Sequence, residues 1–146
     1  MSPYSIEKAS PYLLNRLAEG MNAELRATLR PLGLTQRHWR VLAFLASAGR
    51  VPIIALARDA LIPHSTLSRL LARMERAAVV RRSNGKRDLR LAEYALTSRG
   101  ERLYRRALPR VVALNQTLLN GMPRRAQRAL DRQLAHMLSN LERAKQ

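Results

Sequence analysis

Residues 64–97 constrain the fold more than any other stretch, because they pass from a helical to a strand-like pattern. The first part places apolar residues at helical spacing, on one stripe: Leu67, Leu70, Leu71, Met74 and Ala78. The dipeptide Asn84-Gly85, a strong hairpin signal, then precedes a strand-like segment from Leu89 to Leu96. We therefore predict a helix with one buried stripe, whose N-cap is either Ile62 or Ser65, followed by an antiparallel hairpin.

The face opposite that stripe and the hairpin are polar and mostly basic. Residues 65–110 hold 13 basic and 4 acidic side chains. A helix of this kind suits the major groove of DNA and a basic wing suits the minor groove. The alternative is a solvated polar face. We predict DNA contacts from the helix residues Ser65, Thr66, Ser68, Arg69 and Arg73, and from the hairpin residues Arg82, Lys86, Arg87, Asp88 and Arg90, with Arg81 beside them.

Helical periodicity continues on both sides of this stretch. The sequence predicts a mainly α fold with a small β-wing, in which residues 34–97 form a winged helix–turn–helix lobe. Residues 10–32 and 98–146 form flanking helices within the same single domain, 1–146. Their apolar stripes exceed what so small a lobe can cover, and a twofold homodimer would bury them. Residues 10–32 and 98–146 are therefore the expected dimerisation region.

Composition narrows the partners. The chain has 27 Lys and Arg against 10 Asp and Glu, a formal charge of +17. Polyanions are the expected partners, with nucleic acid before an anionic membrane surface. No apolar run is long enough to span a membrane and no signal pattern is present, so we expect a cytoplasmic protein.

Catalytic and metal chemistry find little support in the residues. The chain has no cysteine, and its three histidines are widely separated and have no carboxylate beside them: His38, His64 and His136. Zinc or iron ligation requires such clusters, so no metal site and no cofactor are expected. No spacing suggests a Ser-His-Asp arrangement and no glycine-rich loop could hold phosphates. An enzyme is not expected. Trp39 is interpreted as a core residue.

Five motifs in a fixed order resemble the MarR-type winged helix–turn–helix regulators. The resemblance covers about residues 13–145. The motifs are Leu56-Ala57, Ser65-Thr66-Leu67-Ser68-Arg69-Leu70, Leu71 with Met74-Glu75, Asp88-Leu89-Arg90, and Leu96-Thr97-Ser98-Arg99-Gly100. One departure is Ala78, where the family often has a glycine that closes the recognition helix.

The resemblance implies a homodimeric regulator that binds double-stranded DNA near its own promoter, at a pseudo-palindromic operator. It further implies that Arg90 enters the minor groove while Asp88 orients it. A repressor is the expected role. In the family a small-molecule ligand often binds in a cleft between the dimer helices and the DNA-reading lobe, and its binding releases the DNA.

Two rival functions remain. A non-sequence-specific nucleoid-like or RNA-binding protein would use the charge alone and show no preference for any promoter. A cationic amphipathic-helix protein that docks on membranes is the weaker rival, because the hairpin with Asp88 and Arg90 has no role in it.

Overall fold

The computed structural model describes residues 5–85 and 91–145, and it confirms the predicted mainly helical fold with a small sheet. The chain divides into two compact units, Met1–Val112 and Ala113–Gln146. In the described residues the elements are η1 (Ile6–Lys8), α1 (Ser10–Leu29), η2 (Arg30–Leu32), α2 (Gln36–Ala48), β1 (Arg50–Pro52), α3 (Ile53–Asp59), α4 (His64–Arg76), β2 (Val80–Asn84), β3 (Ala92–Leu96), α5 (Ser98–Leu118) and α6 (Arg124–Arg143).

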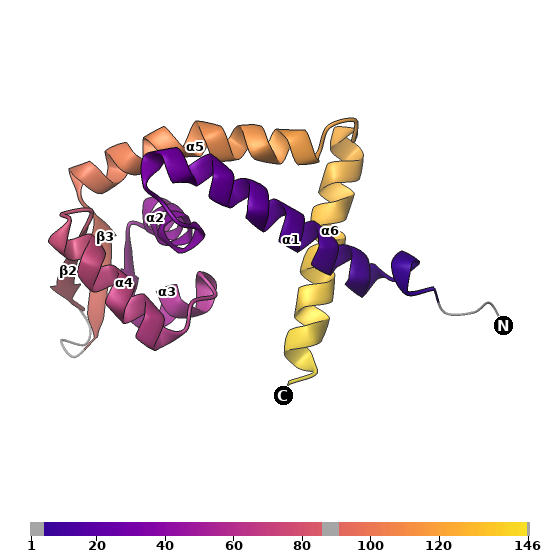
Figure 1. Cartoon of the computed structure of the whole chain (residues 1–146). Helices are drawn as coiled ribbons and strands as arrows, with labels where there is room; N and C mark the ends of the chain where they lie inside the picture. The colour runs from indigo at the N-terminus through magenta and orange to yellow at the C-terminus, as the bar shows by residue number, and fades with distance from the viewer. Residues whose placement is uncertain (1–4, 86–90, 146) are drawn as a thin grey trace. The chain divides into compact units, whose positions relative to one another are not determined.

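The core of the first unit lies among α2, α3, α4 and the sheet (Figure 1). Leu67 and Leu71 of α4 are 0% exposed, and Leu70 and Met74 are also buried, so the predicted stripe is confirmed for these four residues. Ala78 is exposed, because α4 ends at Arg76 and the chain has already turned. The N-cap of α4 is Pro63, and neither Ile62 nor Ser65 takes that position.

The sheet has the strand order β1-β3-β2, and both pairs are antiparallel. The hairpin formed by β2 and β3 is confirmed, but Asn84-Gly85 does not make a two-residue turn. Asn84 still pairs with Ala92, and the Gly85 N–H donates to the carbonyl of Leu91 at 2.7 Å. Pairing therefore extends through the dipeptide. Strand β1 was not predicted, because three residues carry no readable periodicity.

The end of α4 and the start of β2 are joined by a Schellman motif. The Val79 N–H donates to the Met74 carbonyl and the Ala78 N–H donates to the Glu75 carbonyl, both at 2.8 Å. Such a motif needs one residue in the left-handed region, and Ala78 occupies it with φ of 55°. A side chain with a Cβ is strained there, so the departure noted in the sequence has a cost in stability.

We expect Ala78→Gly to raise the free energy of unfolding by about 1 kcal/mol, because glycine adopts the left-handed conformation without this strain. Urea unfolding followed by circular dichroism measures the change. Ala77→Gly is the matched control: Ala77 has φ of −80°, so glycine brings no relief there and should not stabilise the protein. Equal effects of the two substitutions would contradict this account of the helix end.

The start of α5 is fastened to the same turn by Thr97. Its hydroxyl donates to the Ala78 carbonyl at 2.6 Å and accepts from the Gly100 N–H at 3.1 Å, so it caps α5. The Thr97 N–H donates to the Val79 carbonyl at 3.1 Å. Gly100 lies so close to this turn that a Cβ placed on it would be 2.1 Å from the Val79 carbonyl oxygen. The Leu-Thr-x-x-Gly motif is thus a close contact between α5 and the end of α4.

Each unit leaves apolar side chains in solvent. In the first unit, Leu13 on α1 is 51% exposed, and Leu17 and Met21 are exposed beside it. In the second unit, Leu138 and Leu141 on α6 are 62% and 57% exposed, and no described residue of α6 is buried. None of the helices is long and apolar enough to cross a membrane, as judged over the described residues.

Candidate nucleic-acid interface

Helices α3 and α4 contact each other and form a helix–turn–helix (Figure 1). The turn is a second Schellman motif, in which the Ile62 N–H donates to the Ala57 carbonyl at 3.0 Å and Leu61 has φ of 55°. The buried side chain of Ile62 then anchors the start of α4 in the core. Because its four apolar residues are held in the core, α4 presents its opposite face to solvent.

The five predicted contact residues of α4 are together on that open side. Ser65, Arg69 and Arg73 are exposed, and Thr66 and Ser68 are half-buried. Hydroxyl groups therefore occupy the first turns and guanidinium groups follow them. This order places short hydrogen-bonding groups where a helix end would approach DNA and longer cations where they reach phosphates or guanine edges.

The N-terminus of α4 has no side-chain cap. Its N-cap, Pro63, supplies no side-chain hydrogen bond, so the first amides of the helix have no side-chain partner at that position. Amides at a helix N-terminus, together with the helix dipole, attract phosphate groups.

The two arginines at the base of the hairpin lie on opposite faces of the sheet. Arg82 pairs across the strands with Tyr94, whereas Arg81 pairs with Ala95, and successive strand residues face opposite ways. Burial raises the pKa of Tyr94, and the charges of Arg82 and of Glu75 on α4 also act on it, so Tyr94 and Arg82 are on the side of the sheet that α4 covers. Lys86, Arg87, Asp88 and Arg90 lie outside the described residues.

The cations of this surface have few carboxylates near them. In residues 5–85 and 91–145 the ion pairs join Arg50 to Glu93, Arg58 to Asp59, and Arg105 to Glu101. Within those residues, none of the arginines of α4 or β2 is in an ion pair. Their charge is therefore available to an external anion.

A cleft of about 600 Å³ lies between the end of α1, the start of α2 and α4. We call it the α2–α4 cleft. Its cations are Arg26, Arg30, Arg37 and Arg73, and His38 lies among them. Sequence reasoning missed Arg26, Arg30 and Arg37, since they are remote in sequence from α4 and belong to ordinary helix faces.

His38 closes a capping box at the start of α2. The Thr35 N–H donates to His38 Nδ1 at 3.1 Å, while the His38 N–H donates to Thr35 Oγ1 at 3.3 Å. Nδ1 accepts a hydrogen bond, so the neutral ring carries its proton on Nε2. Burial lowers the pKa of His38, and the charge of Arg73 lowers it further.

Protonation of His38 should therefore destabilise the fold. The unfolded ring, with its ordinary pKa, takes up a proton before the folded ring does, so stability is full above that pKa and falls as the pH drops through it. His38→Gln keeps a capping-box residue that does not titrate. Between pH 8 and pH 5 we therefore expect the native protein to lose more of its free energy of unfolding than the variant does. The same change in the free energy of unfolding with pH in the two proteins, measured by urea unfolding, would contradict this role of His38.

Trp39 belongs to the packing of the first unit. Its ring stacks on that of Tyr104, with centroids 5.6 Å apart and planes 11° apart, and thereby joins α2 to α5. The interpretation of Trp39 as a core residue agrees with this position. No group of three or more potential metal ligands occurs in the part of the chain that the structure describes.

Comparison with known sequences finds transcriptional regulators. The family model described as MarR family matches residues 32–91. An HTH-type transcriptional repressor of Mycobacterium tuberculosis is 30% identical over 129 residues, which cover 88% of this chain and 93% of that protein. The HTH-type transcriptional regulator FarR of Neisseria gonorrhoeae is 34% identical over 86 residues, and that match spans 59% of each protein.

Solved structures extend the likeness to nearly the whole chain. A crystal structure of a MarR-family transcriptional regulator from Silicibacter pomeroyi has a TM-score of 0.86 and 31% identity, and the match covers 96% of this chain and 94% of that one. NadR in complex with 4-hydroxyphenylacetate has a TM-score of 0.81 and 28% identity, with coverages of 94% and 97%.

Proposed function

This chain belongs to the MarR family of transcriptional regulators, and on that premise we propose that it is a homodimeric repressor of a pseudo-palindromic operator. The observation that carries the proposal is the open face of α4. Its hydroxyl groups and arginines are free of carboxylate partners within the described residues, and its N-terminal amides have no side-chain cap. A surface of this kind fits the major groove.

The division of labour follows from the chemistry of the residues. Arg69 and Arg73 reach base edges or phosphates from α4, while Ser65, Thr66 and Ser68 bond phosphates or bases near its N-terminus. Arg82, Lys86 and Arg87 neutralise phosphates along the wing. Arg90 enters the minor groove and Asp88 orients it, as the family resemblance implies. Phosphate neutralisation dominates affinity and makes it depend steeply on salt.

The dimer is supported by the apolar residues that each unit exposes. Leu13 and Leu17 of α1 are exposed in the first unit, and Leu138 and Leu141 of α6 are exposed in the second. A twofold interface would bury such surfaces. Two copies of α4 would then enter successive major grooves about 34 Å apart.

A small organic acid is the proposed effector. NadR, similar to this chain over most of its length, is solved with 4-hydroxyphenylacetate. In this chain the α2–α4 cleft offers several cations beside Thr66 and Arg73 of α4, where an anion would compete with DNA for the same groups. Membership in a family of transcriptional regulators agrees with the expectation that the chain is not an enzyme.

Selection of bound duplexes from a random-sequence pool tests the proposal. We expect an enriched inverted repeat whose half-sites are about 10 base pairs apart, the spacing of a twofold helix–turn–helix dimer. Enrichment of no sequence would favour binding by the +17 charge alone, the rival function. Enrichment of a single half-site would contradict the dimer and leave specific recognition in place.

A further inference from the structure

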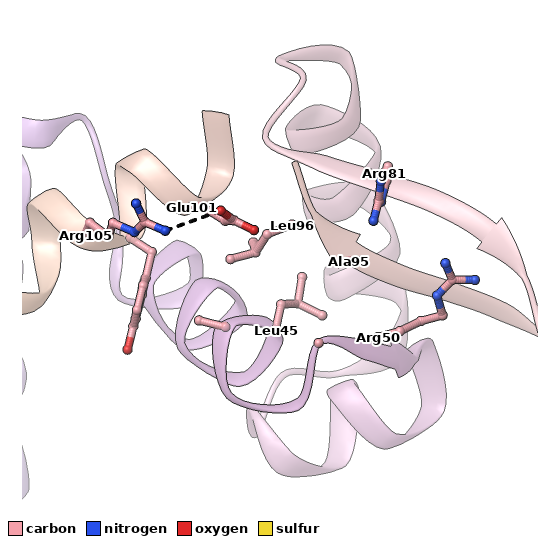
Figure 2. A pocket seen from close by; sticks show the side chains of 10 residues that line it. Leu45, Arg50, Arg81, Ala95, Leu96, Glu101 and Arg105 are labelled. Atoms are coloured by element: carbon pink, nitrogen blue, oxygen red, sulfur yellow. Dashed lines mark ion pairs between the residues drawn. The ribbon is translucent and has the colours of Figure 1, made fainter. Parts of the chain in front are cut away.

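A second hollow in the first unit lies on the face of the sheet that points away from α4. It has a volume of about 530 Å³ and is bounded by the end of α2, the sheet and the first turns of α5 (Figure 2). We call it the sheet notch. In the strand register Ala95 pairs with Arg50 on one side and with Arg81 on the other, so these three residues share one face. Arg82 is on the other face.

The small side chain of Ala95 makes the hollow. Two long side chains, Arg50 and Arg81, rise on either side of it, and a larger central residue would fill the space between them (Figure 2). Leu45 and Leu96 line the notch beside Ala95, and all three are buried residues of the core region. The notch therefore has an apolar floor and two cations at one end.

One end of the notch carries an excess of positive charge and the other end does not. At one end Arg50 and Arg81 share the sheet face with one carboxylate, Glu93, which lies 3.9 Å from Arg50, and Arg81 is without an ion pair in the described residues. At the other end Arg105 is paired with Glu101 at 3.6 Å (Figure 2). An anionic group is attracted to the first end, whereas the Glu101 carboxylate would repel a second negative group at the other. The notch suits a single negative charge on an apolar body.

We propose that the sheet notch binds a small organic monoacid, with its carboxylate between Arg50 and Arg81 and its apolar body over Leu45, Ala95 and Leu96. A guanidinium binds a carboxylate through charge-assisted hydrogen bonds, and apolar contact adds affinity that a bare anion lacks. Because Arg81 and Arg82 are consecutive in β2, a bound anion places negative charge next to the DNA-facing side of the wing. This effector role rests on the proposed function.

Isothermal titration of the full-length protein with cyclohexanecarboxylate, in the absence of DNA, tests the site. We expect saturable binding that is weakened about tenfold or more by Arg81→Gln. Glu101→Gln should tighten it severalfold, because it removes the repelling charge. Arg99→Ala is the matched control, since Arg99 lies on α5 outside the notch and should leave binding unchanged. Cyclohexanecarboxamide and inorganic phosphate, which lack the charge and the apolar body respectively, should bind more weakly.

Three results would overturn the site: no saturable binding, equal binding of the carboxamide, or equal losses in Arg81→Gln and Arg99→Ala. Loss of binding in Arg30→Ala with full binding in Arg81→Gln would show that the titrated acid binds only in the α2–α4 cleft, and would overturn the notch as a second site.

A separate titration of the DNA complex tests regulation. We expect cyclohexanecarboxylate to lower the DNA affinity of the native protein and to have less effect on Arg50→Ala. An unchanged DNA affinity at saturating ligand contradicts the effector role alone. If no specific DNA is bound at all, the proposed function fails, and the DNA-free titration still decides the site.

Discussion

Replacing Gly100 with alanine should lower the free energy of unfolding by about 3 kcal/mol, at the upper end of overpacking substitutions. The new Cβ would stand 2.1 Å from the carbonyl oxygen of Val79. The same oxygen accepts a hydrogen bond from the Thr97 N–H at 3.1 Å, so it cannot move without loss of a contact that fastens α5 to the end of α4. Helix propensity favours alanine by only about 1 kcal/mol, so the clash prevails.

Gly20→Ala provides the control for this prediction. Gly20 lies within α1, and a Cβ there would meet nothing within 4 Å. Alanine should leave stability unchanged or raise it by up to about 1 kcal/mol. Thermal and urea unfolding of the two variants measure the difference. If Gly100→Ala were as stable as Gly20→Ala, the close contact of α5 with the end of α4 would be wrong.

Arg69→Ala should weaken binding to the operator by about 10- to 100-fold, the effect of losing one base contact. Binding to a random duplex should fall by much less. Arg69 is exposed on α4 and not engaged by a carboxylate in the described residues, so its replacement should leave the fold intact and remove only the contact to DNA that we propose for it.

Lys86→Ala is the comparison for Arg69→Ala. Loss of a wing lysine that contacts phosphate should weaken binding to both duplexes about equally. It should also reduce the slope of log affinity against log salt concentration by about one. Fluorescence anisotropy on both duplexes, over a range of salt concentrations, gives the affinities. Equal losses on the two duplexes in both variants would contradict the assignment of base readout to α4 and phosphate contact to the wing.

The helical part of the fold could be predicted because its signals are local. The apolar stripe of α4 comes from the spacing of Leu67, Leu70, Leu71 and Met74, and these residues are buried as the spacing requires. Strand β1 could not be predicted in the same way. Val51 is in a strand only because it pairs with Tyr94, more than forty positions along the chain. Long-range pairing of three residues leaves no local pattern.

The hairpin shows where a good local signal still misplaces a turn. Asn84-Gly85 indicated the connection, but the pairing of Asn84 with Ala92 carries the strand through it. Register also separates Arg81 from Arg82, which the sequence presents as one basic pair. Only the pairing of Arg81 with Ala95 shows that it faces the sheet notch and not the side of α4.

The candidate site also has a part that the local sequence predicts and parts that it does not. The residues of the polar face of α4 all lie within residues 65–73, so their spacing in the sequence predicts them as one group. The α2–α4 cleft and the sheet notch assemble residues from separate helices and strands, such as Arg30 with Arg73 and Arg50 with Arg105. Each of these arginines alone is indistinguishable in sequence from a solvated surface residue.

The most direct test of specific DNA recognition is the affinity of the purified protein for the intergenic DNA upstream of its own gene. Fluorescence anisotropy would compare this duplex with a scrambled duplex of equal length over a range of salt concentrations. A dimeric regulator predicts a preference of about a thousandfold or more, with two chains bound per site at saturation. Equal binding to both duplexes that vanishes with salt, together with no sequence enriched from a random pool, would contradict it.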